Sequence, residues 1–143
     1  MALTVTYVES SYVQQVWPKI KDYIQAALGK GTDNENVTPD YTLEHVQSYL
    51  ANGDWLLVVA ADEEKNIRGC ATISFLNYPL HRVAFMTSVG GRWITYPDEF
   101  EQFKALLKAH GATKIQGYGR DSMLRLGKKF NFQSVNTLVE VEI

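Results

Sequence analysis

The chain has little cysteine. Its 143 residues include one, Cys70, and a single cysteine excludes a disulfide framework within the chain. Cys70 lies in an apolar run, which indicates a small buried side chain more than a nucleophile. The three histidines, His45, His81 and His110, are widely separated and lack the paired spacing of metal ligands, so we expect no metal site.

Long apolar runs and an excess of either charge are also missing. No uncharged stretch approaches the ~18 apolar residues of a membrane span, and the first ten residues lack the basic start of a signal peptide. The net charge is −2 and the pI is near 5.9. This gives no overall electrostatic attraction to nucleic acid or an anionic membrane. We expect a soluble cytoplasmic protein that neither binds membranes nor acts mainly on nucleic acid.

Common catalytic and nucleotide-binding motifs are absent as well. The sequence contains no P-loop, no dinucleotide fingerprint and no Gly-x-Ser-x-Gly turn. It also has no internal repeat, low-complexity tract or linker, so residues 1–143 are expected to form a single domain.

What the chain does have is a hydrophobic content of 45%, ordered in clear periods. Alternation predicts a strand over residues 3–8, and helical spacing predicts a helix over residues 10–28, capped by Ser10 or Ser11. Pro18 interrupts that helix, which therefore either kinks there or restarts with Pro18 in its first turn. A shorter helix is expected over residues 42–52, with Thr42 as its cap.

The second half switches period twice. Residues 55–61, 67–76 and 82–89 read as three strands of an antiparallel meander. A helix with Thr95 as its cap and Pro97 in its first turn is expected to extend to residue 110. A strand over 114–118, a helix from about residue 121 to 130 and a last strand over 137–143 complete the chain. The expected fold is α/β with a mixed sheet, in the order β-α-α-β-β-β-α-β-α-β.

Several short stretches carry a resemblance to known proteins. They are Val16-Trp17-Pro18, Tyr41-Thr42-Leu43-Glu44, Gly53-Asp54-Trp55, Asn77-Tyr78-Pro79, Gly90-Gly91 and Gly119-Arg120-Asp121-Ser122-Met123-Leu124. The order of elements resembles that of the GNAT N-acetyltransferases, in which a mixed sheet splays near its fourth strand and acetyl-CoA enters the gap. The stretches themselves resemble small GNAT-like proteins of tailed phages and prophages. The layout is also similar to that of the internal virion protein A of T7-type phages.

The resemblance implies a cofactor site where the helix after the meander begins. In the family, backbone N–H groups of a Gly-rich loop and the helix N-terminus hold the pyrophosphate of acetyl-CoA. The family pattern is Arg or Gln, two residues, Gly, one residue, then Gly or Ala. This chain reads Gly90-Gly91-Arg92-Trp93-Ile94-Thr95-Tyr96-Pro97-Asp98-Glu99 at that place, so the pattern is absent.

Acidic residues argue against the cofactor. Pro97 removes one N–H donor, and Asp98, Glu99 and Glu101 are expected to put negative charge where the phosphates would lie.

Two glycines and one arginine favour binding of the cofactor. Gly90 and Gly91 would permit close backbone approach, although they also suit a bulge or turn that ends a strand. Arg92 could hold a phosphate. Acetyl-CoA thus remains a candidate ligand that the sequence does not favour. The candidate cofactor-binding residues are Ser88, Val89, Gly90, Gly91, Arg92 and Arg120.

The resemblance also implies a proton donor that this chain lacks at the expected position. Aligning Asn131-Phe132 with the family's Gly-Phe puts Arg120 at the position of its Asn and Gly127 at that of its Tyr. Gly127 cannot be an acid, so Tyr118 is the candidate, unless it is a core or rim residue. No carboxylate occurs in residues 82–89. Glu44 and His45 on the expected substrate-side helix are the candidate bases, unless each belongs to a solvated helix face.

Three functions follow as hypotheses. The sequence favours a GNAT-like protein that does not acetylate and binds a phage or host protein, in the host cytoplasm or packaged in the virion. The alternative is an active N-acetyltransferase that uses acetyl-CoA on a protein or small-molecule amine. The third is a nucleic-acid accessory protein acting through the basic cluster Arg120, Arg125, Lys128 and Lys129, which otherwise is a solvated face.

Overall fold

A five-stranded mixed sheet organises the protein. The computed structural model describes residues 2–29, 40–118 and 127–143, and within them the strand order is β1-β2-β3-β4-β5. The strands are β1 Thr4–Val8, β2 Leu56–Ala61, β3 Ile67–Asn77, β4 Arg82–Gly91 and β5 Lys114–Gly117. Neighbours from β1 to β4 are antiparallel, and β5 runs parallel to β4. The expected mixed sheet and its central meander are confirmed.

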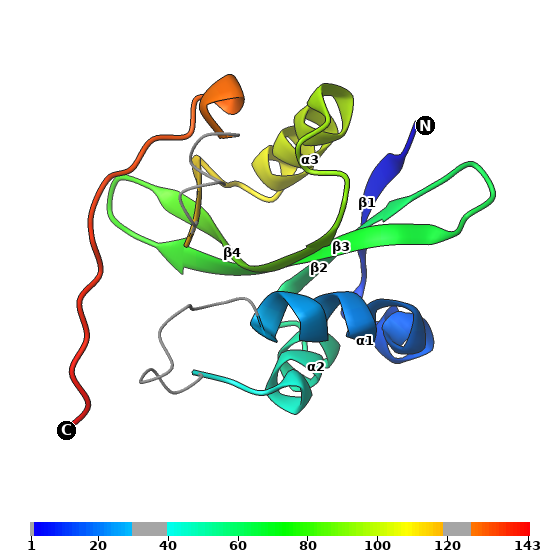
Figure 1. Ribbon diagram of the computed structural model, residues 1–143, viewed down its shortest axis with the longest axis horizontal. Coiled ribbons are helices and arrows are strands. Elements are labelled where there is room, and N and C mark those ends of the chain that lie inside the picture. The colour runs from blue at the N-terminus through cyan, green and yellow to red at the C-terminus, as the bar shows by residue number, and fades with distance from the viewer. Residues whose placement is uncertain (1, 30–39, 119–126) are drawn as a thin grey trace.

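Helices cover both faces of this sheet (Figure 1). Helices α1 (Val13–Gly29) and α2 (Leu43–Ala51) lie on one face. Helix α3 (Pro97–Ala109) and the short 3₁₀ turn η2 (Lys128–Phe130) lie on the other. The central strands are therefore buried from both sides, which explains why β2 is a continuous apolar run instead of an alternating one.

Strand alternation divides the core into two parts. Val58 and Ala60 of β2 pack in the cluster that contains α3, whereas Leu57 and Val59 pack against α1 and α2. Cys70 belongs to the second cluster, and burial raises the pKa of its thiol to about 12. The expectation that Cys70 is a small buried side chain is confirmed.

The structure corrects details of the helix starts. The 3₁₀ turn η1 (Ser10–Tyr12) precedes α1, and Ser10 and Ser11 are part of that turn instead of capping the helix. Pro18 lies inside α1, so the helix does not restart there. Thr42 caps α2 as expected, in a capping box with His45. Helix α3 begins at Pro97 with Tyr96, not Thr95, at its cap position.

Side chains of α3 occupy the outer edge of β1. The Gln102 amide oxygen accepts a hydrogen bond from Val5 N at 2.9 Å, and its nitrogen donates to Leu3 O at 3.0 Å. The Glu99 carboxylate accepts from Leu3 N at 3.3 Å. Because unpaired strand edges invite association, α3 protects this edge of the sheet with side chains instead of another strand.

Replacing Gln102 with methionine is expected to lower the free energy of unfolding by about 1–2 kcal/mol, because two hydrogen bonds to β1 are lost while the side-chain volume is kept. Urea denaturation measures the change. The matched control is Gln47→Met on α2, where one exposed hydrogen bond to Gln14 is lost and a change below about 0.5 kcal/mol is expected. Equal effects of the two substitutions would refute the role given to Gln102.

The prediction of a last strand over residues 137–143 is wrong for the described structure. Residues 131–143 contain no strand or helix, and Val139 and Val141 are 85% and 84% exposed. The alternation of apolar side chains is typical of a strand, but a strand forms only where a partner supplies backbone hydrogen bonds. Most of the helix expected over residues 121–130 lies outside the described residues, and the described end of that range contains the 3₁₀ turn η2.

Among the described residues, none of the helices combines the length and the apolar character that a membrane crossing requires.

Candidate functional site

The main irregularity of the sheet lies between β4 and β5. These strands pair only where Val83–Met86 of β4 meets Lys114–Gly117 of β5. Beyond Met86, β4 continues to Gly91 and pairs with β3 alone. Within the described chain, the segment Thr87–Gly91 therefore has one edge without a neighbouring strand. Such an edge offers backbone N–H and C=O groups to an extended ligand.

A β-bulge marks the beginning of this open segment. Thr72 pairs with Ser88 and Ile73 pairs with Met86, so Thr87 is the extra residue on β4. Its carbonyl accepts a hydrogen bond from the Tyr41 hydroxyl at 3.2 Å. The bulge thus turns a backbone acceptor toward the side chain that precedes α2.

Buried hydroxyl groups hold the bulge in place. Thr72 Oγ1 lies 2.6 Å from both Thr87 Oγ1 and Ser88 Oγ, and Thr87 Oγ1 donates to Thr72 O at 2.9 Å. Val89 packs against the core on the α3 side. The side chains of the candidate residues Ser88 and Val89 are therefore engaged in contacts within the protein. These residues can offer a ligand only their backbone groups.

Gly90 and Gly91 are required by packing. A Cβ on Gly90 would lie 2.7 Å from Tyr23 Cβ in α1. Gly91 has φ +84° at the end of β4, and a Cβ there would collide with the Arg68 carbonyl. The strand-ending alternative considered for this pair thus accounts for Gly91, whereas close packing against α1 accounts for Gly90.

Trp93 anchors the loop that leads from β4 to α3. Its side chain is fully buried, its indole N–H donates to Gly90 O at 3.0 Å, and the backbone N–H of Tyr96 donates to Trp93 O at 3.1 Å. Arg92, the residue before it, is exposed. The exposed Arg92 therefore lies in an anchored loop that joins the end of β4 to the N-terminus of α3.

The acidic residues of α3 differ from the expectation. Glu99 is buried and its carboxylate turns to β1, and Glu101 forms an ion pair with Lys104 at 3.3 Å. Asp98 is the remaining exposed acid in the first turn. The prediction of three acids around the phosphate position is thus wrong for Glu99, and the charge of Glu101 is partly offset.

Two tyrosines lie near the divergence of β4 and β5. Tyr118 directly follows β5, is 71% exposed and contacts the Phe85 ring edge-on at 5.1 Å. Tyr41 contacts Trp55 edge-on at 5.2 Å. Burial first, then the charges of Asp40 and Tyr118, raises the pKa of Tyr41, so its hydroxyl keeps its proton. Tyr118 therefore sits at the open edge with an accessible hydroxyl.

Sequence reasoning did not identify Tyr41 as a site residue. It occurs directly before a capped helix, a position that by itself indicates only a loop. The signal that reveals it is the contact with the bulged residue Thr87, 46 positions away in the chain. Periodicity within a segment cannot show such a contact.

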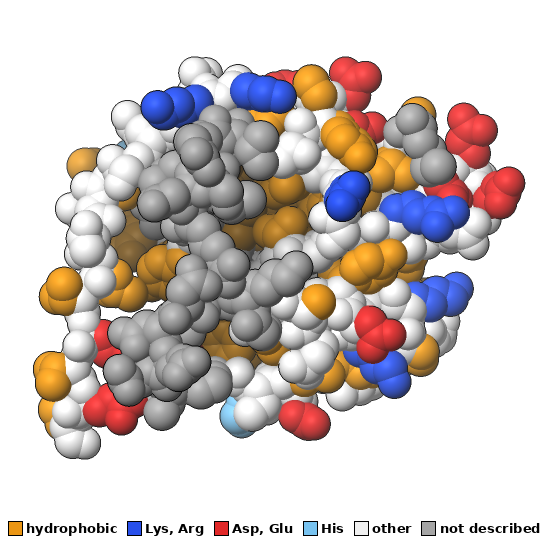
Figure 2. Space-filling model, viewed as in Figure 1, with side chains coloured by type: hydrophobic (Ala, Val, Ile, Leu, Met, Phe, Trp, Pro, Cys, Tyr) orange, Lys and Arg blue, Asp and Glu red, His pale blue; other side chains and the backbone are white. Residues whose placement is uncertain are grey.

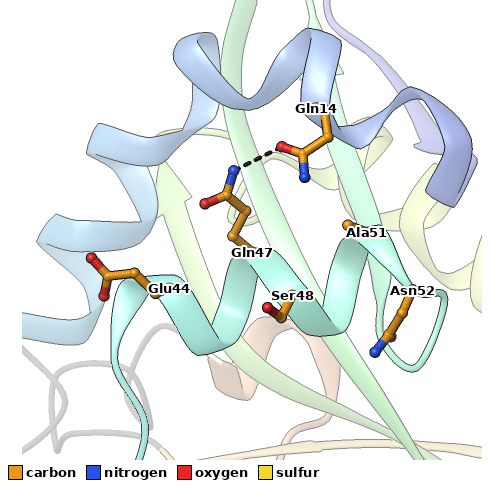
Figure 3. Close-up of a pocket in the computed structure, with 6 residues that line it drawn as sticks. All are labelled: Gln14, Glu44, Gln47, Ser48, Ala51 and Asn52. Atoms are coloured by element: carbon orange, nitrogen blue, oxygen red, sulfur yellow. Dashed lines mark hydrogen bonds between the residues drawn. The ribbon is translucent and has the colours of Figure 1, made fainter.

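Glu44 belongs to a different part of the surface. It lines a hollow of about 470 Å³ together with Gln14, Gln47, Ser48, Ala51 and Asn52. Figure 3 shows the Glu44 carboxylate at one end of the residues that α2 contributes to this hollow. Gln47 donates a hydrogen bond to Gln14 of α1 at 2.7 Å. The hollow contains no residue of β4 or β5, so the structure does not bring Glu44 together with Tyr118.

The remaining candidates are placed as follows. Arg120 and Arg125 lie outside the described residues, whereas Lys128 and Lys129 are exposed on η2. A Cβ on Gly127 would lie 3.0 Å from Phe132 Cβ, so a tyrosine would be crowded at this position. In the described part of the chain, no group of His, Cys, Asp or Glu side chains is arranged to hold a metal ion.

Comparison of sequences gives no relative, since no protein-family model and no curated protein matches the chain. Comparison of structures finds several proteins with a similar fold. The chain is similar to a GCN5-related N-acetyltransferase from Ralstonia eutropha JMP134 (TM-score 0.69, 8% identity, 99% of each chain covered). It is also similar to a predicted acetyltransferase with acetyl-CoA from Clostridium acetobutylicum (TM-score 0.65, 16% identity, 99% of this chain and 96% of that one).

A third similar structure is an aminoglycoside acetyltransferase from an uncultured soil metagenomic sample, in complex with sisomicin (TM-score 0.66, 14% identity, 99% of this chain and 95% of that one). At these identities the similarity concerns the fold. The layers, the mixed sheet and the divergence of β4 from β5 agree with it. The chain therefore has the fold of the GNAT acetyltransferases.

Proposed function

We propose that the protein is an N-acetyltransferase that binds acetyl-CoA along the open edge of β4 and transfers its acetyl group to an amine. The observation that carries the proposal is the unpaired segment Thr87–Gly91, with the exposed Tyr118 at the end of the neighbouring strand. A similar fold in the Clostridium acetobutylicum protein was determined with acetyl-CoA.

The residues present fit part of the cofactor well. Backbone groups of Val89 would hold an extended amide-containing chain at the strand edge, because alternate residues of a strand direct their backbone groups to opposite edges and the Gly90 carbonyl already accepts from the Trp93 indole. Arg92 would interact with a phosphate, with Arg120 as a second candidate from the sequence. Pro97 at the first position of α3 lacks an N–H donor, so the helix N-terminus contributes less than in a Gly-rich loop.

The chemistry that the chain's own residues would supply is modest. When bound, acetyl-CoA supplies an activated acetyl thioester. Tyr118 would hold a proton at its hydroxyl for the departing sulfur, and Tyr41 would position β4 through the Thr87 carbonyl. Glu44 lies elsewhere, and the described carboxylate whose charge acts on Tyr41 at this edge is that of Asp40. Asp40 would be the candidate to accept a proton from the amine.

Titration calorimetry with acetyl-CoA tests the binding step. Arg92→Ala is expected to weaken binding about tenfold, and Asp98→Asn is expected to strengthen it, because one removes a positive and the other a negative charge near the phosphates. Lys19→Ala on the exposed side of α1 is the matched control and should leave affinity unchanged. No heat with the wild-type protein, or the same affinity for all three variants, contradicts the proposal.

A second candidate is a protein-binding role without acetylation, in a phage or prophage setting, either in the host cytoplasm or packaged in the virion. Two observations favour it: the family's Gly-rich phosphate pattern is absent, and large apolar side chains are exposed after residue 134. Mass spectrometry of purified phage particles tests the virion role. A nucleic-acid role through Lys128 and Lys129 predicts salt-sensitive retention on DNA.

A further inference from the structure

Three aromatic rings, here named the aromatic row, lie in contact one after another on the α2 side of the sheet. The centroids of the Tyr41 and Trp55 rings are 5.2 Å apart, and those of Trp55 and Tyr49 of α2 are 4.7 Å apart. The backbone N–H of Trp55 donates to Tyr49 O at 3.0 Å, which holds these two residues together. The row begins at β4, because the Tyr41 hydroxyl donates to Thr87 O at 3.2 Å. It therefore leads from the bulge of β4 to the surface of α2.

The last ring of the aromatic row is accessible. Tyr49 and Trp55 are inclined to each other by 33°, so Tyr49 turns one face toward Trp55. Its exposed fraction of 37% leaves the other face to solvent. The face of an aromatic ring attracts a cation through the ring quadrupole, and tryptophan and tyrosine do so well. The row thus has the electronic character of a binding site for an organic cation.

The chain around the aromatic row carries negative charge. Residues 40–64 contain no lysine or arginine, and Asp40 and Asp54 directly precede Tyr41 and Trp55. Neither carboxylate forms an ion pair with another described residue. Figure 2 shows acidic and histidine side chains at the lower margin of the molecule, where Figure 1 places α2. These acids add attraction over a longer range to the local attraction of the rings.

The histidine of α2 does not oppose a cation in this arrangement. His45 lies one helical turn before Tyr49 and therefore shares a side of α2 with it. Its Nδ1 accepts a hydrogen bond from Thr42 N at 2.9 Å. An imidazole nitrogen that accepts a hydrogen bond carries no proton, so this ring is uncharged.

We infer that the acceptor amine carries a second positive charge at the far end of an aliphatic chain, and that Tyr49 and Trp55 bind this distal cation. The acceptor assignment rests on the proposed function. The reacting amine would lie at Tyr41, on which the charge of Asp40 acts, and the aliphatic chain would follow the aromatic row. In the transfer, the amine nitrogen bonds to the acetyl carbon as the carbon–sulfur bond breaks. Asp40 takes the amine proton and Tyr118 gives one to the sulfur, so the distal cation serves binding only.

Titration calorimetry with spermidine, without acetyl-CoA, tests the cation site. Spermidine has ammonium groups at both ends of an aliphatic chain. Tyr49→Leu is expected to weaken its binding about fivefold, because a cation gains nothing from an aliphatic side chain, whereas Tyr49→Phe keeps the ring and should bind as the wild type does. Tyr12→Leu is the matched control, since Tyr12 is an exposed tyrosine on η1, away from the row. No binding by the wild type, or equal binding by Tyr49→Leu, overturns the inference.

A thiol-release assay with acetyl-CoA tests whether the bound cation belongs to the acceptor. Monoacetylated spermidine keeps one primary amine but lacks the positive charge at the other end. We expect a KM about tenfold lower for spermidine than for this analogue, with similar kcat, and we expect Tyr49→Leu to abolish the difference. Equal KM values for the two amines leave the proposed function in place and refute the distal cation. Spermidine binding without thiol release from either amine refutes the acetyltransferase and leaves the cation site standing.

Discussion

Trp93→Ala is expected to lower the free energy of unfolding by about 3–5 kcal/mol, the largest effect of any single substitution proposed for this protein. Trp93 is fully buried in the core on the α3 side. It contacts the Phe103 ring edge-on at 5.3 Å and lies so close to Gly69 that no side chain fits there. Its removal leaves a large cavity and takes the indole hydrogen bond away from the Gly90 carbonyl.

Urea denaturation followed by circular dichroism measures this change. Trp93→Phe keeps an aromatic ring but loses the indole hydrogen bond, and it should cost about 1–3 kcal/mol. Trp55→Ala is the control for removing a tryptophan, and it should cost less than Trp93→Ala because Trp55 is only partly buried. If Trp55→Ala destabilises the protein as much as Trp93→Ala, Trp93 is not the anchor described above.

Tyr118→Phe is expected to reduce kcat about 100-fold with little change in KM, if Tyr118 supplies the proton for the departing thiolate. The ring remains in contact with Phe85, so binding and folding should be preserved. A thiol-release assay with acetyl-CoA and a panel of primary amines measures the rate. The variant is compared with the wild type on the amine that gives the fastest turnover.

Tyr41→Phe separates the two tyrosines. The Tyr41 hydroxyl already donates to the Thr87 carbonyl, so its loss should alter KM more than kcat by loosening the β4 bulge. Glu44→Gln should leave both constants unchanged, because Glu44 lines a separate hollow on α2. If Tyr41→Phe causes the larger loss in kcat, the proton donor is Tyr41 and the assignment of Tyr118 is wrong.

The sequence was most informative where structure depends on local pattern. Alternation and helical spacing predicted the meander and the helices α1, α2 and α3 to within a few residues, because a buried face repeats every two or 3.6 residues. Errors occurred at the ends. Ser10 and Ser11 have the chemistry of caps, yet they form a 3₁₀ turn, and residues 137–143 have the pattern of a strand without a neighbouring strand.

The candidate site could be predicted only in outline. Resemblance identified β4 and the start of α3 as the region, and Tyr118 as a residue near it. It did not show that Glu99 turns toward Leu3, 96 residues away, which removes one of the charges expected to repel a phosphate. Nor did it reveal Tyr41, whose role depends on a bulge at Thr87 that arises from the register between β3 and β4.

Composition and apolar periodicity, read from the sequence alone, determined the class of fold, the buried state of Cys70 and the absence of a disulfide framework. These properties depend on each segment's own residues and on the burial of apolar surface. Only the tertiary structure decided where β5 leaves β4, which acids of α3 remain exposed and which segment of β4 has a single neighbouring strand among the described residues. The physical reason is that these features depend on hydrogen bonds and packing between residues far apart in the chain, which no local pattern records.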